Sequence, residues 1–260
     1  MQRVALLGRP VQQALPVLAD YIDAGMKFFV AKVDLGEMES AEELNPLQVT
    51  FESDEFMLPI RLGMTNAIPG EDQELVAWFL TDQGQVEVQN YPFVRIPTDA
   101  DIPNAVREDF GGFYQAVFDT AHERQGARSV FFEYGWDMGW CDPCAADPLS
   151  EKQLVELGVP QGTQPYVSRV HMRYNEDTHA EDLMLRVTNN RQNFQGRYII
   201  NNPFDVSWTD LLKQCARDYR REVRVRQVNE LATLSELTGG WEPEISATDA
   251  AAGSRGGSGS

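Results

Sequence analysis

Basic residues and cysteines are scarce in this chain of 260 residues. Lysine and arginine number 22 against 40 acidic residues, and the formal net charge is −18. A surface of that sign repels phosphate backbones, so we expect no nucleic acid among the partners of this protein. The need for solubility in water is by itself a sufficient explanation of this net negative charge.

Long apolar runs are also missing. No stretch approaches the roughly 20 apolar residues that a membrane-spanning helix needs. The patch Val4 to Leu7 is too short for the core of a signal peptide. The chain as given is therefore expected to carry no membrane span and no export signal. Either it is cytoplasmic, or its true start is missing.

The three cysteines are Cys141, Cys144 and Cys215, too few for a disulfide framework. Cys215 falls on the apolar stripe of a long helix expected from Ser207, and we predict it to be buried. The sequence contains no P-loop, dinucleotide fingerprint or nucleophile elbow. No cofactor is therefore predicted.

Hydrophobic periodicity predicts an α+β fold, a mostly antiparallel sheet with covering helices and a long C-terminal helix. Helices are expected over 16–24, 104–124, 150–157 and from 207 to the Gly239-Gly240 pair. Extended segments are expected over 27–35, 47–52, 56–62, 129–136, 166–174, 183–188 and 197–201. Segments 74–81 and 85–89 should form a hairpin, and 96–103 a loop.

We expect one domain over residues 1–246, with a possible internal boundary near 99–103. The Gly/Ser-rich segment 247–260 lacks apolar periodicity and should be a disordered tail.

The most informative motif is the turn Trp140-Cys141-Asp142-Pro143-Cys144. Two residues between cysteines suit a tight disulfide, a redox pair or two ligands of a metal. The favoured interpretation is a structural disulfide between Cys141 and Cys144, with Trp140, Asp142 and Pro143 supporting the turn. No catalytic residue is assigned.

Two alternatives stay open for this turn. Trp140, Pro143 and the preceding strand resemble a thioredoxin site, with Cys141 as nucleophile and Cys144 as resolving thiol. Asp147-Pro148 interrupts the helix that such a site needs directly after the turn. The second alternative is a metal-stabilised module, in which Cys215 and a histidine such as His171 would complete the ligands.

The last helix carries five arginines within ten residues, of which Arg217, Arg221 and Arg224 share one face. The strip is explained by a solvated face or by pairing with acidic loops of the same chain. A patch for a protein partner is the sharper alternative.

Several segments together resemble one bacterial family, domain of unknown function 2330. They are GMKFFVAKV (25–33), PLQVTFESDEFMLPIRLG (46–63), FFEYGWDMGWCDPCAADPLS (131–150), YVSRVHMRY (166–174) and NFQGRY (193–198). The resemblance runs from about Tyr21 to the end of the last helix, and the string around the two cysteines is its most specific part.

The resemblance implies an exported protein of the bacterial envelope, periplasmic or extracellular, with no activity to carry over. It also implies a further cysteine-containing half upstream, so that this chain would match the second half only. That upstream half would be a candidate partner for the chain. In an oxidising compartment the Cys141 and Cys144 pair is expected to be oxidised.

Overall fold

A computed structural model describes residues 16–26, 52–68, 70–140, 147–204, 206 and 213–243. These residues cluster into two compact units. The first lies within the residues up to Gln73 and Asn175–Leu185, and the second comprises Glu74–Tyr174 and the residues from Arg186 onward. The chain passes from one unit to the other after residues 73, 174 and 185, and none of these positions lies at 99–103. The expectation of a single domain over 1–246 stays a prediction.

The first unit contains short elements, and the Asp182 carboxylate joins two of them, α2 (Pro16–Asp23) and α3 (Ile60–Gly63). The others are β1 (Met57–Leu58), η3 (Met64–Asn66) and the start of β8 (Leu183–Val187). β1 pairs antiparallel with β8, so that Leu58 lies opposite Leu183. The Asp182 carboxylate accepts hydrogen bonds from the Tyr21 hydroxyl and from the backbone N–H of Arg61.

The expected extended run over 56–62 is only partly right. Two residues form β1, and the chain then turns into α3 directly after Pro59. Proline cannot donate to a strand ladder, whereas it fits the start of a helix. The expected strands at 27–35 and 47–52 lie outside the described residues, apart from Glu52, which is not in a strand.

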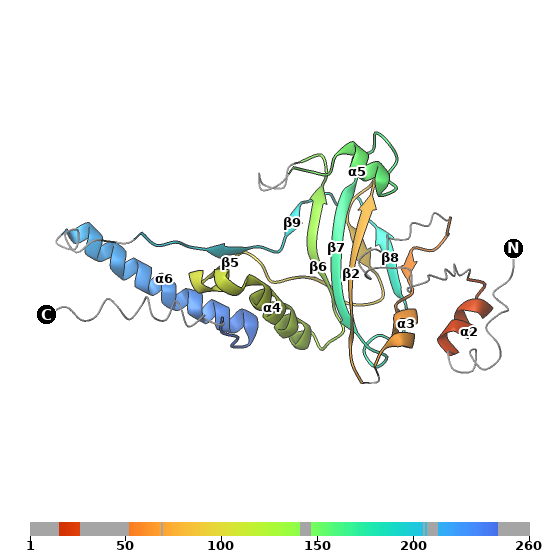
Figure 1. Ribbon diagram of the computed structural model, residues 1–260, viewed down its shortest axis with the longest axis horizontal. Helices are drawn as coiled ribbons and strands as arrows, with labels where there is room; N and C mark the ends of the chain where they lie inside the picture. The colour runs from red at the N-terminus through yellow and green to blue at the C-terminus, as the bar shows by residue number, and fades with distance from the viewer. Residues whose placement is uncertain are drawn as a thin grey trace, which may run out of the picture. The chain divides into compact units, whose positions relative to one another are not determined.

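A five-stranded sheet forms the centre of the second unit, and β6, β7 and β2 lie side by side in it (Figure 1). Its main path is β2-β7-β6-β4, and β9 pairs with β6. The strands are β2 (Gln73–Thr81), β4 (Phe93–Arg95), β6 (Val130–Asp137), β7 (Tyr166–Tyr174) and β9 (Phe194–Gln195). β6 runs antiparallel to β7 and β9 and parallel to β4.

Helix α4 (Phe110–Arg124) covers this sheet through its apolar face. Phe113, Val117 and Phe118 are buried, and the Phe118 ring meets the Phe131 ring of β6 edge-on at 5.4 Å. The preceding turns form the 3-10 helix η4 (Asn104–Asp109), and the Asp109 side chain caps α4 by accepting from the Gly112 N–H. The expected helix over 104–124 is therefore present, with its regular part starting late.

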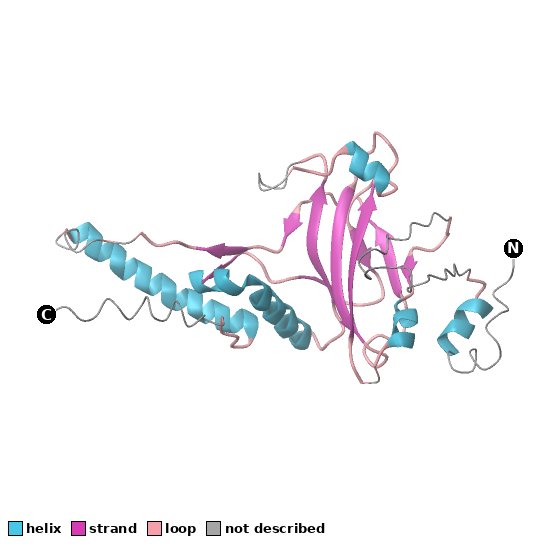
Figure 2. Cartoon of the chain, in the orientation of Figure 1, coloured by secondary structure: helices cyan, strands magenta, loops and turns pink. Residues whose placement is uncertain are grey.

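The long C-terminal helix α6 (Gln214–Thr238) packs beside α4 (Figure 2). The Arg124 guanidinium donates to the Glu236 carbonyl across this pair. α6 ends at Gly239, whose positive φ of 65° is the left-handed conformation that glycine adopts at helix ends. No described helix is both long enough and apolar enough to cross a membrane.

The expected hairpin over 74–89 is wrong. β2 is present, but β3 (Val86–Val88) belongs to the sheet that contains β8, whereas β2 neighbours β7. The backbone of Gln85 exchanges hydrogen bonds with Asn190 and Thr188 instead of with β2. Gly84 lies against the carbonyl oxygens of these same two residues, where a Cβ would clash.

The expected loop over 96–103 also needs correction. Its residues Ala100–Ile102 form β5, which pairs in parallel with β10 (Tyr198–Ile200). The two prolines flank β5 and so do not remove donors from it. The mixed α+β class is confirmed, and α5 (Glu151–Glu156) begins after its expected cap Ser150.

Candidate functional site

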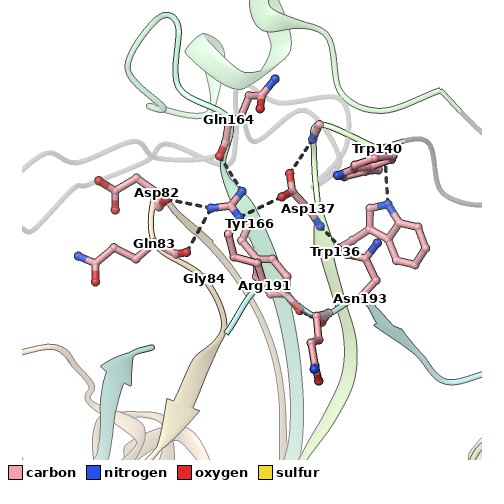
Figure 3. A network of polar contacts seen from close by, with 12 residues as sticks. Asp82, Gln83, Gly84, Trp136, Asp137, Trp140, Gln164, Tyr166, Arg191 and Asn193 are labelled. Atoms are coloured by element: carbon pink, nitrogen blue, oxygen red, sulfur yellow. Dashed lines mark hydrogen bonds and ion pairs between the residues drawn. The ribbon is translucent and has the colours of Figure 1, made fainter. Parts of the chain in front are cut away.

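Hydrogen bonds fix the strand end that leads into the cysteine turn (Figure 3). The Trp136 indole N–H donates to the Trp140 carbonyl at 3.0 Å. The Gly139 N–H donates to the Asp137 carboxylate at 2.9 Å, and the Met138 N–H donates to the Pro165 carbonyl. The last residue before Cys141 therefore lies in a closed turn.

Arg191 ties this strand end to two other loops, as Figure 3 shows. Its Nε donates to the Asp137 carboxylate at 2.9 Å. Its Nη1 donates to the carbonyls of Asp82 and Gln83, and its Nη2 donates to the carbonyl of Gln164. We call Asp137, Arg191 and these three carbonyls the Arg191 network.

The Arg191 guanidinium binds acceptors that belong to the same chain. Nitrogens Nε, Nη1 and Nη2 all have acceptors, and one acceptor is a carboxylate, so the charge is already paired. The hydrogen bond from Arg191, with that from the Gly139 N–H, lowers the pKa of Asp137 despite the opposing effect of burial. An anionic ligand would have to displace these partners, so the network serves to hold the loops.

The buried Tyr166 side chain lies next to the Arg191 network. Tyr166 is fully buried, its hydroxyl donates to the Gln192 carbonyl at 2.7 Å, and the Arg191 guanidinium lies 6.0 Å from its ring. Gly135 leaves room for this ring, because a Cβ there would clash with Tyr166 and Phe132. Burial raises the pKa of Tyr166 to about 12.

Apolar side chains are exposed around the same end of the sheet. Trp140 is 67% exposed and Leu157 is 57% exposed. The residues before and after the cysteine turn also line a cavity of about 270 Å³. Its lining includes Met138, Leu149, Leu154, Val155 and Pro160.

The helix that follows the cysteine turn is capped by its own residues. The Ser150 hydroxyl accepts from the Gln153 N–H, and the Gln153 side chain accepts from the Ser150 N–H, which makes a full capping box. α5 starts at Glu151, seven positions after Cys144. In a thioredoxin-like site the first cysteine lies at a helix N-terminus. Residues 147–150, which are the described residues between the turn and α5, are not helical.

The predicted site residues divide into three groups. Trp140 lies in the closed turn, whereas Cys141, Asp142, Pro143 and Cys144 lie outside the described residues. His171 lies in a buried cluster described below. The predicted burial of Cys215 is wrong, because this cysteine is exposed near the start of α6. Only the C-terminal half of α6 has fully buried residues, so the apolar stripe does not extend to Cys215.

A second group of charged side chains is buried around Glu133, which precedes Asp137 in β6. Glu133 is 3% exposed, and it sits at a β-bulge where Phe132 opposes Val170 but Tyr134 opposes Arg169. Its carboxylate lies 2.8 Å from the His171 Nδ1 and 3.2 Å from an Arg169 nitrogen. A bulge of this kind turns a side chain away from the regular alternation.

The cluster continues to the edge strand β2. His171 Nε2 lies 2.9 Å from the Glu74 carboxylate, which also pairs with Arg173 at 3.4 Å. The imidazole stacks on the Phe118 ring at 3.8 Å. We call Glu74, Glu133, Arg169, His171 and Arg173 the Glu133 cluster.

Electrostatics of the Glu133 cluster favour an ionised Glu133. Burial acts to raise the pKa of Glu133, but the hydrogen bonds from His171 and Tyr114 and the nearby positive charges outweigh it, so the pKa is lowered. Burial and Glu133 together raise the pKa of Tyr114, which keeps its phenol neutral. The cluster therefore holds a carboxylate inside the protein, where charges occur only when paired.

The metal alternative gains no support from the described residues. Among them, no group of three or more candidate side chains could hold a metal ion. Both His171 nitrogens lie against carboxylates. Because Cys141 and Cys144 lie outside the described residues, the alternative as a whole stays untested.

The arginine strip of α6 is exposed. Arg217, Arg221 and Arg224 all face solvent. Arg221 donates to Asp218 at 2.9 Å, and Arg217 donates to Gln214 at 2.7 Å, both within the same helix. A role for the strip in binding a partner stays a prediction.

Sequence reasoning missed Glu133, Asp137 and Arg191. One signal was available for the first, since Glu133 is the only charged residue in the apolar run SVFFEYGW. A second was the alternation of Arg169, His171 and Arg173 along one strand, which places three basic side chains on one face. No local pattern marks Arg191, because its partners come from the end of β6 and from two separate loops.

Comparison with known proteins identifies the family. Residues 10–186 match a family described as an uncharacterized protein conserved in bacteria, DUF2330. The chain belongs to this family. No curated protein matches the chain, and no solved structure matches it.

The matched range differs in its limits from the resemblance seen in the sequence. It begins at residue 10 instead of about Tyr21, and it ends at residue 186, before α6. It includes the cysteine turn, β6 and β7. The expectation that the chain matches only the second half of the family is not confirmed, because the match covers most of the chain.

Proposed function

We propose that this member of the DUF2330 family is an exported, non-enzymatic domain of the bacterial envelope, with a structural or binding role. A disulfide between Cys141 and Cys144 closes a turn that the end of β6 presents. The observation that carries this proposal is the closed framework before the turn. Trp136 holds Trp140, and Arg191 holds Asp137, with all partners inside the protein.

The framework favours a presented turn over a catalytic one. Catalytic thiols of the thioredoxin type need a helix N-terminus to stabilise the thiolate. Here α5 starts at Glu151 and satisfies its own first N–H groups. The exposed Trp140 gives the presented turn an apolar side chain that suits binding.

The redox state of the turn tests the proposal directly. Protein isolated from an oxidising compartment is alkylated under denaturing conditions, with and without prior reduction, and weighed by mass spectrometry. We expect one alkylated thiol without reduction, Cys215, and three after reduction. Three alkylated thiols without reduction would contradict the disulfide.

A stability measurement tests whether the disulfide is structural. The double variant Cys141→Ser and Cys144→Ser should keep the fold and lose about 2 kcal/mol, since the closed loop is short. Cys215→Ser is the matched control and should change stability by less than about 0.5 kcal/mol, because the residue is exposed.

The oxidoreductase alternative makes the opposite prediction. Reduced protein would then reduce insulin disulfides catalytically, and Cys141→Ser would abolish the turnover. We expect no turnover above the rate of a small dithiol at equal concentration.

For the location, fractionation of cells that carry the full-length gene should place the protein outside the cytoplasm, and its recovery in the cytoplasm would refute export.

A further inference from the structure

His171 has an arrangement of partners that neutral histidine cannot satisfy. Its Nδ1 lies 2.8 Å from Glu133 and its Nε2 lies 2.9 Å from Glu74. The imidazole side chain is 7% exposed, Glu133 is 1% exposed and Glu74 is 45% exposed. The ring therefore spans from a fully buried carboxylate to one that reaches solvent.

Hydrogen-bond chemistry assigns the protonation state of this ring. An ionised carboxylate can only accept hydrogen bonds, and neutral imidazole carries a single N–H. Glu133 forms an ion pair with Arg169 at 3.2 Å and Glu74 forms one with Arg173 at 3.4 Å, so both carboxylates are ionised. Both ring nitrogens must then donate, which only the imidazolium form can do.

The charges around the ring lead to the same assignment. The carboxylates are Glu133 from β6, Glu74 from β2 and Asp119 from α4, which pairs with Arg173 at 2.8 Å. The guanidinium groups are Arg169 and Arg173 from β7 itself. Two further titratable neighbours are the phenols of Tyr114 from α4 and Tyr198 from β10, and both stay neutral because their pKa values are raised. One further positive charge balances the group, and the His171 imidazolium supplies it.

We propose that His171 is a proton-dependent clasp that holds the start of edge strand β2 on β7. When the imidazolium loses a proton to solvent, the proton leaves from Nε2, on the side of the half-exposed Glu74. The Nδ1–H stays on the buried Glu133. The Nε2 lone pair then faces a carboxylate, the hydrogen bond is lost, and Glu74 keeps only its contact with Arg173.

Loss of the hydrogen bond between His171 Nε2 and Glu74 affects the structure because of where Glu74 lies. Glu74 is the first residue of the second unit, and Arg173 lies one residue before the chain leaves this unit at Tyr174. β2 lies at the edge of the main sheet path, so β7 is its neighbour within that sheet. Releasing Glu74 therefore loosens β2 where it begins. This inference is independent of the cysteine turn.

Histidine NMR combined with hydrogen exchange tests the clasp. The chain has three histidines, so their ring ¹⁵N signals can be followed individually from about pH 5 to about pH 9. We expect both His171 nitrogens to be protonated at the lower end and Nε2 alone to deprotonate. Amide exchange over the first residues of β2, after correction for the intrinsic pH dependence, should rise about tenfold over the same pH interval.

Glu74→Gln separates the clasp from a merely structural contact. The glutamine amide can accept from Nε2–H or donate to bare Nε2, so the contact survives in both protonation states. We expect β2 exchange in this variant to become independent of His171 titration. Glu71→Gln, which removes the same charge at an exposed position, should keep the wild-type response.

Four results would overturn the clasp. His171 could stay protonated across the whole range, which would make it a fixed ion pair. His171 could be neutral at the lower end, which would contradict the hydrogen-bond assignment. Finally, β2 exchange could stay constant while His171 titrates, or keep its pH response in Glu74→Gln.

Discussion

The Glu133 cluster and the Arg191 network both place charge along strand β6, only a few residues apart, but they stabilise it with different partners. The partners of Glu133 are side chains, those of His171, Tyr114 and the nearby arginine Arg169. Arg191 is surrounded mainly by backbone carbonyls, which do not titrate. Both regions contain a carboxylate whose pKa is lowered by its partners, but Glu133 depends on other side chains, whereas Arg191 also holds loops through their backbone.

Burial separates the two regions further. The Glu133 side chain is 1% exposed, while the Arg191 side chain is 31% exposed. Removing one member of a fully buried pair leaves an uncompensated charge, which costs far more than removing a partly solvated one. The comparison therefore predicts a clear order of mutational effects.

The largest effect is expected for Glu133→Ala. The variant leaves His171 and Arg169 without their buried carboxylate, and it should lose about 3–5 kcal/mol of unfolding free energy. Denaturant unfolding followed by circular dichroism measures the loss. Glu123→Ala at an exposed position of α4 is the control and should stay within about 0.5 kcal/mol. A loss as small as the control's would mean that Glu133 is solvated.

Gly135→Ala tests the packing beneath the Arg191 network. The added methyl group would clash with Phe132 and Tyr166, so we expect a loss of about 1–3 kcal/mol from overpacking. Gly111→Ala is matched to it, because no atom lies within 4 Å of the new Cβ, and α4 should be unchanged or slightly more stable. Thermal unfolding compares the two, and equal melting temperatures would refute the close contact at Gly135.

Arg191→Lys keeps the charge but removes the planar group that reaches several acceptors. We expect a loss of about 1–2 kcal/mol, because the freed carbonyls are partly solvated. Arg186→Lys, at an exposed ion pair with Glu87, should lose less than about 0.5 kcal/mol. Chemical denaturation measures both variants. If they behaved alike, the network would be no more than a surface ion pair.

The smallest effect is the response to acid, which Glu133 should dominate because it is more deeply buried than Asp137, whose pKa is also lowered. Because the pKa of Glu133 is lowered in the folded protein, its contribution is complete above the ordinary value of 4.5 and is lost as the pH falls below it. Unfolding free energy measured against pH should therefore decline more steeply in the wild type than in Glu133→Gln. Parallel curves would show that Glu133 does not couple protonation to folding.

Local patterns predicted most of the regular elements. β7 has the bounds expected from its alternation, 166–174, and β6 and α4 lie close to theirs. The errors arose where pairing depends on distant residues. Gln85 pairs with Asn190 and Thr188, and Ala100 pairs with Tyr198, and no local signal records either contact.

The sequence by itself determined the elements, the acidic surface and the family marker around Cys141 and Cys144, because periodicity, charge and motif are local properties. Only the tertiary structure decided which charges meet. Glu133, His171 and Glu74 lie on three strands, and Arg191 joins loops that are far apart in the chain. Strand order and a β-bulge bring them together, and both follow from the packing of the whole sheet.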